Sequence, residues 1–165
     1  MGAGASVLVG ALLAQGLRVT AIDIADAALV ALSGQLAKRS LDPQAIDDDH
    51  RPRLIVADVR TIRLDHEVDV WHDRAVFHFL IDDDDRRAYA ESAAAAVRPG
   101  GHLVIAAFAP NGPASCSSLP VMRHDAASFM AAFGASFELV ESFERTHVTP
   151  WSSDQPFIHA VLRRR

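Results

Sequence analysis

The chain has 165 residues, of which half are apolar and 22% are charged, a composition typical of one folded domain rather than of a disordered chain. The formal net charge of −5 argues against a general electrostatic footprint for nucleic acid, and no apolar run is long enough for a membrane span. The single cysteine, Cys116, excludes an internal disulfide and a zinc site built from several thiolates. No secretory signal opens the sequence, so we expect a cytoplasmic protein.

Stretches of helical and strand character alternate along the chain. Apolar stripes, caps and stop signals predict helices over residues 5–15, 26–39, 82–97 and 125–133. Runs of apolar and β-branched residues predict strands over residues 18–22, 53–57, 68–72, 102–108, 137–143 and 157–162. The polar residues 40–53, which include two prolines, are expected to form a mobile connection.

The order of these elements predicts an open α/β sheet with helices on both faces, formed by a single domain over residues 1–165. The last two predicted strands are separated by few residues and should pair antiparallel. Ligands of such sheets bind beyond the carboxyl ends of the strands. Three acids, Asp23, Asp58 and Asp73, each directly follow a predicted strand, so we expect them at that edge.

The first 23 residues have the pattern of the second half of a nucleotide-binding βαβ unit. Gly2 and Gly4 precede an apolar helix, and Asp23 lies nineteen residues after Gly4. In such a unit the glycines let the backbone approach the ligand, and the acid binds ribose hydroxyls. A Gly-x-Gly pair alone is often only a turn, so the spacing to Asp23 is what favours a nucleotide site. The strand expected before Gly2 is missing, and we expect an N-terminally incomplete domain that a homo-oligomer or a completing chain would stabilise.

Several motifs, spread over nearly the whole chain, resemble those of class I S-adenosylmethionine-dependent methyltransferases: Gly2-Ala3-Gly4-Ala5-Ser6, Asp23, Ala57-Asp58-Val59, Asp69-Val70-Trp71-His72-Asp73-Arg74 and Arg98-Pro99-Gly100-Gly101. The Asp73-Arg74 pair is also similar to the thiopurine methyltransferase-like branch of small-molecule methyltransferases. The resemblance implies a Rossmann-like sheet, mostly parallel with an antiparallel C-terminal strand pair, in three αβα layers and without its first strand. It also implies S-adenosyl-L-methionine as cofactor and a small-molecule methyl acceptor, with no nucleic-acid or membrane partner.

The resemblance further implies where the sugar and the methionine portion of the cofactor lie. The backbone of Gly2, Ala3 and Gly4 would face the methionine portion, and Asp23 would bind both ribose hydroxyls.

For the adenine and the acceptor side, the resemblance implies a second group of residues. Asp58 would hydrogen-bond the adenine amino group, and Ile24 and Val59 would flank its ring. Asp73 and Arg74 would lie near the methionine end and the substrate mouth.

Methyl transfer is an in-line displacement, so the protein mainly has to align donor and acceptor in a dry pocket. A general base is needed only when the acceptor must lose a proton, and the candidates are His72, His78 and His147. His78 lies between two phenylalanines and is more readily explained as a packed core residue, and Asp73-Arg74 could also form a surface ion pair.

Metal and nucleophile interpretations of other residues are weaker. Residues 82–85 and 47–50 resemble metal ligands by composition only, and a run of carboxylates is more often a solvated helix start, so no metal is expected. Cys116 has no identifiable partner histidine and is expected to be inert.

Two other functions stay open from the residues. One is an NAD(P)-dependent Rossmann oxidoreductase, against which Val7 occupies the third glycine position of its fingerprint and the only lysine, Lys38, precedes the only tyrosine. The other is a non-catalytic, truncated methyltransferase-like protein, which the missing first strand motivates. Such a chain is expected to be poorly stable when expressed alone.

Overall fold

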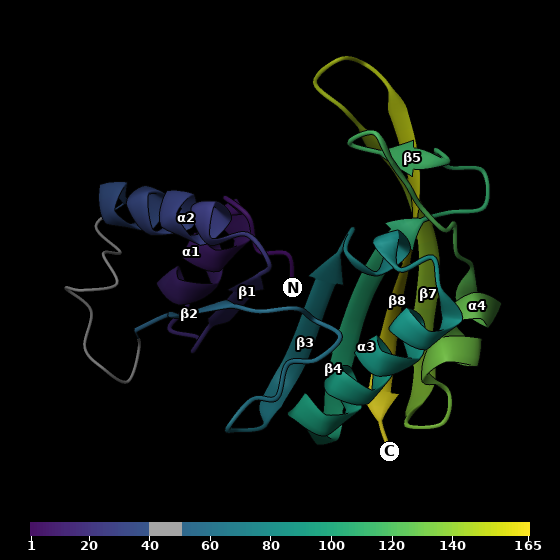
Figure 1. Cartoon of the computed structure of the whole chain (residues 1–165), viewed down its shortest axis with the longest axis horizontal. Coiled ribbons are helices and arrows are strands. Elements are labelled where there is room, and N and C mark those ends of the chain that lie inside the picture. The colour runs from purple at the N-terminus through teal and green to yellow at the C-terminus, as the bar shows by residue number, and fades with distance from the viewer. Residues whose placement is uncertain (40–50) are drawn as a thin grey trace. The chain divides into compact units, whose positions relative to one another are not determined.

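The structure is a computed structural model that describes residues 1–39 and 51–165. The chain divides into two compact units, Met1–Val59 and Arg60–Arg165 (Figure 1). The single domain expected over residues 1–165 stays a prediction. Most of the connection predicted over residues 40–53 lies outside the described residues.

The first unit contains two parallel strands and two helices: α1 (Val7–Ala14), β1 (Thr20–Asp23), α2 (Asp26–Lys38) and β2 (Arg53–Val56). The side chain of Ser6 caps α1 by accepting a hydrogen bond from the Leu8 N–H. Leu29, Leu32 and Leu36, which recur at helical spacing along α2, are buried and pack with residues of α1 and β1 in one apolar cluster. This packing positions the carboxyl end of β1 and the start of α1, which follows the loop of Gly2 and Gly4.

The second unit contains a four-stranded mixed sheet and the elements that pack on it: β3 (Val68–Arg74), the 3₁₀ helix η1 (Phe77–Phe79), α3 (Asp83–Ala96), β4 (Val97–Phe108), β5 (Ser115–Cys116), β6 (Leu119–Pro120), α4 (Ala126–Phe133), β7 (Phe137–Val148) and β8 (Asp154–Arg164). The strand order is β3-β4-β8-β7, with β3 and β4 parallel and the other two pairs antiparallel (Figure 1). The predicted antiparallel terminal pair is therefore confirmed.

The helices α3 and α4 pack on the same face of this sheet. Tyr89 of α3 contacts both Trp71 of β3, with ring centroids 5.8 Å apart, and Phe133 of α4, at 5.9 Å. Phe77 of η1 lies 5.1 Å from Tyr89 and 5.0 Å from Phe133. All four side chains are buried, so an aromatic core joins η1, α3 and α4 to the sheet.

Several strand boundaries differ from those predicted. Both terminal strands are longer, because β7 extends to Val148 and β8 begins at Asp154. Residues 97–101 precede the strand predicted from residue 102, but they belong to it, because β4 begins at Val97 directly after α3. The short β5–β6 hairpin lies between the strand predicted over residues 102–108 and the helix predicted over residues 125–133, where no strand was predicted. None of the helices in the described residues is long and apolar enough to cross a bilayer.

Candidate functional site

The glycine loop of the first unit is tied to the acid at the end of β1. Gly2 and Gly4 have φ angles of +57° and +48°, which side-chain-bearing residues rarely adopt. The Gly4 N–H donates to Oδ2 of Asp23 at 2.9 Å, and the Ala25 N–H donates to Oδ1 at 2.9 Å. The carboxylate of Asp23 is thus held in one orientation at the carboxyl end of its strand, and each oxygen keeps a further lone pair for a ligand hydroxyl.

The neighbouring strand brings a second acid to the same edge. The Ala57 N–H donates to the Asp23 carbonyl oxygen at 3.0 Å, which continues the parallel pairing one residue beyond β2. Asp58 follows and is half-buried, as is Val59. Ile24, directly after β1, is 71% exposed. The first unit therefore presents close-approach backbone, two carboxylates and an exposed apolar surface at one sheet edge.

Asp73, in contrast, lies in the core of the second unit and is fully buried. Its Oδ2 accepts hydrogen bonds from the Tyr89 hydroxyl at 2.6 Å and from the Phe77 N–H at 3.2 Å, and its Oδ1 accepts one from the Val76 N–H at 2.9 Å. Burial raises the pKa of Asp73, and these hydrogen bonds oppose that rise. This arrangement anchors η1 to the end of β3, while the expected cofactor contact of Asp73 stays a prediction.

Arg74 occupies the opposite face of β3, because successive strand residues alternate between the two faces. It lines a cavity of about 310 Å³, here named the arginine pocket, whose walls are residues of β3, β7 and β8: Arg74, Arg145, Thr146, His147, Val148, Phe157 and His159. The Arg74 guanidinium carbon lies 5.4 Å from the centroid of the Phe157 ring. Arg74, expected near the substrate mouth, and His147, a candidate base, are thus brought together, and His78 is not among the lining residues.

His78 is fully buried in η1, beside Phe79 and Phe108, whose ring centroids both lie 4.6 Å from its own. Neither of its ring nitrogens has a hydrogen-bond partner among the described residues. Burial and the nearby His124 lower the pKa of His78 to about 4, so it is neutral at pH 7. This environment fits a packed core histidine, and a role as general base stays a prediction. Burial is also the main cause that lowers the pKa of His72.

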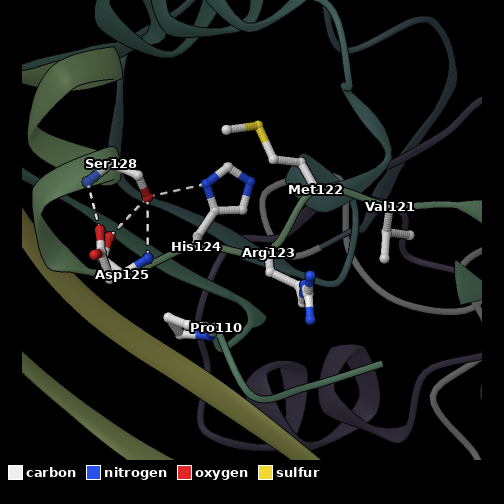
Figure 2. A pocket seen from close by; sticks show the side chains of 7 residues that line it. All are labelled: Pro110, Val121, Met122, Arg123, His124, Asp125 and Ser128. Carbon is white, nitrogen blue, oxygen red and sulfur yellow. Dashed lines mark hydrogen bonds between the residues drawn. The ribbon is translucent and has the colours of Figure 1, made fainter. Parts of the chain in front are cut away.

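A second pocket lies at the start of α4 and has a volume of about 520 Å³ (Figure 2). Its wall includes His124, whose Nδ1 lies 3.1 Å from the Ser128 hydroxyl. Ser128 also completes a capping box with Asp125, because each side chain accepts a hydrogen bond from the other residue's N–H. Burial and then the charge of Arg86 lower the pKa of His124 to about 4. The histidine is therefore a neutral, fixed part of the wall.

No cluster of three or more potential metal ligands forms within residues 1–39 and 51–165. The carboxylates at the start of α3 pair instead with arginines: Asp83 with Arg86, Asp84 with Arg87, and Asp85 with Arg60. Residues 47–50 lie outside the described residues. The lone thiol of Cys116 is half-buried beside the apolar cluster of β4 and β8.

His124, Arg145 and His159 are polar residues of these pockets that sequence reasoning missed. Arg145 lies beyond the strand predicted over residues 137–143, so its place in the sheet could not be assigned. The alternation along the predicted strand over residues 157–162 could have placed His159 on the face opposite Ile158, but not beside Arg74.

Residues 1–103 match the model of the family described as "Methyltransferase domain". Because the match covers more than half of the chain, the protein belongs to this family. A search of curated proteins found no significant match.

Solved structures of S-adenosylmethionine-dependent methyltransferases share the fold. One from Methanosarcina mazei is 13% identical with a TM-score of 0.81, covering 99% of this chain and 89% of that one. The 1,6-didemethyltoxoflavin N1-methyltransferase of Burkholderia thailandensis is 22% identical with a TM-score of 0.74, covering 99% and 68%. The N-methyltransferase NodS of Bradyrhizobium japonicum is 16% identical with a TM-score of 0.65, covering 89% and 66%. These structures confirm the predicted Rossmann-like methyltransferase fold, and the family match confirms the predicted enzyme class, rather than an oxidoreductase.

Proposed function

We propose that the first unit binds S-adenosyl-L-methionine at the carboxyl ends of β1 and β2, and that the enzyme transfers a methyl group to a small-molecule acceptor. The observation that carries the proposal is the carboxylate of Asp23, held by the N–H groups of Gly4 and Ala25 at 2.9 Å each. A carboxylate fixed in this way accepts hydrogen bonds from two adjacent hydroxyls without reorganising.

The residues of the first unit fit the chemical groups of this cofactor. The positive φ angles of Gly2 and Gly4 shape a loop without side chains between them and the ligand, apart from the methyl of Ala3. Asp23 supplies acceptors for the ribose hydroxyls, and Asp58 supplies an acceptor for the adenine amino group. Ile24 and Val59 supply apolar surface for the ring, and the exposure of Ile24 fits this role.

When bound, the cofactor supplies an electrophilic methyl group on a sulfonium. The residues of this chain then have to orient the acceptor and keep water away. Arg74 and His147 line one pocket and are the residues we assign to the acceptor side, with His147 as base where the acceptor loses a proton. Asp73 orders η1 behind them. The Asp73-Arg74 pair also supports placement in the thiopurine methyltransferase-like branch.

A small-molecule acceptor is supported by what the similar structures act on. One of them holds 1,6-didemethyltoxoflavin together with S-adenosylhomocysteine, and another is described as a glycopeptide N-methyltransferase. A screen of small thiols, amines and phenols with labelled S-adenosyl-L-methionine would identify the acceptor.

Calorimetry with S-adenosylhomocysteine, which cannot react, tests cofactor binding directly. Asp23→Asn removes the charge while keeping the size, and it should weaken binding by roughly 2–4 kcal/mol, or about 30- to 1,000-fold. Asp26→Asn, in the exposed first turn of α2, is the matched control and should bind normally. Ile24→Ser tests the adenine side without touching the hydrogen bonds of the loop, and should also weaken binding.

Binding of S-adenosylhomocysteine that is equal in wild type, Asp23→Asn and Ile24→Ser would refute the site. Binding of NAD in place of S-adenosylhomocysteine would refute the function.

A further inference from the structure

The arginine pocket carries positive charge that no acid within it balances. None of the seven residues that line it carries a carboxylate. Among the residues that the structure describes, neither Arg74 nor Arg145 takes part in an ion pair; the acids that do pair with arginines, Asp69, Asp83, Asp84, Asp85 and Glu138, pair with others. Two uncompensated guanidinium groups in one concave site attract anions.

The register of the sheet explains why these cations meet. Arg74 pairs with Ala106, Ala106 with His159, and His159 with Phe143, so a row of side chains crosses all four strands on one face. Arg145 lies two residues beyond Phe143 and shares that face. The pKa of the His159 imidazole is lowered by burial and then by the nearby positive charges of Arg74 and Arg145.

Aromatic contacts hold these groups while leaving their N–H donors available. The Arg74 guanidinium lies over the Phe157 ring, and Phe143 stacks on His159 with ring centroids 5.1 Å apart and an angle of 6° between the planes. The parallel ring contact leaves the edge N–H of the His159 imidazole directed away from Phe143, and the cation–π contact of Arg74 does not use its N–H groups as conventional hydrogen-bond donors. The volume of about 310 Å³ suits a small molecule.

We propose that the arginine pocket binds an oxyanion group, a carboxylate or a phosphate, of the methyl acceptor. The forked donors of Arg74 and Arg145 match the oxygen atoms of such a group, and the N–H of neutral His159 adds a further donor. That the ligand is the acceptor rests on the proposed function; oxyanion binding follows from the pocket alone.

The test uses benzoate and phenyl phosphate as anionic probes and benzamide as the neutral match of benzoate. His159 is the reporter, followed by NMR of its ring protons and assigned by their loss in His159→Gln. An oxyanion beside the imidazole raises its pKa, so benzoate or phenyl phosphate should raise the pKa of His159 and benzamide should not. Comparison of the two anions identifies which oxyanion the pocket prefers.

Substitutions then locate the binding. Arg74→Gln and Arg145→Gln should each weaken binding of the preferred anion about tenfold or more. Arg87→Gln is the matched control, because it removes an exposed guanidinium of α3 outside the pocket and should leave the affinity unchanged.

Benzamide binding as tightly as benzoate, or anion affinity that is the same in Arg74→Gln, Arg145→Gln and wild type, would overturn the inference. Calorimetry with S-adenosylhomocysteine on the same samples separates the two proposals. If S-adenosylhomocysteine binds but the anions do not, only the oxyanion site is refuted. If the anions bind but S-adenosylhomocysteine does not, the proposed function is refuted.

Discussion

The Tyr89 hydroxyl donates a hydrogen bond of 2.6 Å to Oδ2 of Asp73, and neither side chain is accessible to solvent. The same hydroxyl accepts a hydrogen bond of 2.9 Å from the indole N–H of Trp71. One oxygen atom therefore satisfies two buried polar groups, and it links α3 to two neighbouring positions of β3. Because a buried polar group without a partner is costly, this hydroxyl contributes to stability beyond the packing of its ring.

We expect Tyr89→Phe to lower the free energy of unfolding by about 2–4 kcal/mol, since it leaves both Asp73 and Trp71 without this partner. Urea unfolding followed by fluorescence measures the change. The double mutant with Asp73→Asn should cost less than the sum of the two single changes, because both remove the same interaction. If the two changes in the free energy of unfolding were strictly additive, Tyr89 and Asp73 would not be energetically coupled.

The buried histidines predict a specific loss of stability in acid. His78 and His124 each have a pKa of about 4 in the folded protein, below the ordinary value of 6.5. Above pH 6.5 they are neutral in both states and contribute no pH dependence. As the pH falls from 6.5 towards 4, the unfolded chain binds protons that the folded protein does not, so each histidine lowers the stability by up to about 1.4 kcal/mol per pH unit.

Denaturant unfolding at pH 7 and pH 5 measures this loss. His78→Leu removes both unpartnered ring nitrogens, so the free energy of unfolding should differ less between the two pH values than in wild type. Relative to wild type, the variant should be more favoured at pH 5 than at pH 7. Taking the difference from wild type at each pH cancels the titration of the carboxylates. A His78→Leu variant with the full wild-type pH dependence would contradict the assignment.

Gly101 shows why one glycine of β4 cannot carry a side chain. A Cβ there would lie 2.8 Å from the Asp69 carbonyl oxygen and 2.9 Å from Cγ1 of Val97. Gly101→Ala should therefore destabilise the second unit by about 1–3 kcal/mol in thermal or chemical unfolding. Gly34→Ala is the control: the position lies in α2 with open space around it, and alanine should raise helix stability by up to about 1 kcal/mol. Equal effects at the two positions would rule out the steric explanation.

The parts of the site that were predictable depend on short-range patterns. The glycine loop, the apolar helix after it and Asp23 lie within 23 residues, and the fixed spacing between them reflects one local unit. The hydrogen bond from Gly4 to Asp23 connects the two ends of that pattern. The terminal antiparallel pair was predictable for the same reason, because a short connection leaves few other ways to pair two strands.

The sequence could not show that the side chains of Asp73 and Arg74 lie in different environments. As neighbours after a strand they were expected near the same substrate mouth, yet strand alternation turns Asp73 towards the aromatic core and Arg74 into the arginine pocket. Assigning their faces required the exact end of β3, which includes both residues. The partners Arg145 and His159 come from strands far along the chain, and their register follows from pairing that no local pattern contains.

The two tryptophans differ so much in solvent exposure that their fluorescence signals can be separated. Trp71 is 1% exposed and Trp151 is 84% exposed, so a blue-shifted emission that acrylamide does not quench belongs to Trp71 alone. Residues 1–59 contain no phenylalanine, tyrosine or tryptophan, and the near-ultraviolet signal therefore comes entirely from the second unit. Far-ultraviolet circular dichroism, in contrast, records helices of both units. Overlaying the two unfolding curves shows whether residues 1–59 and 60–165 lose structure in one cooperative step or in two.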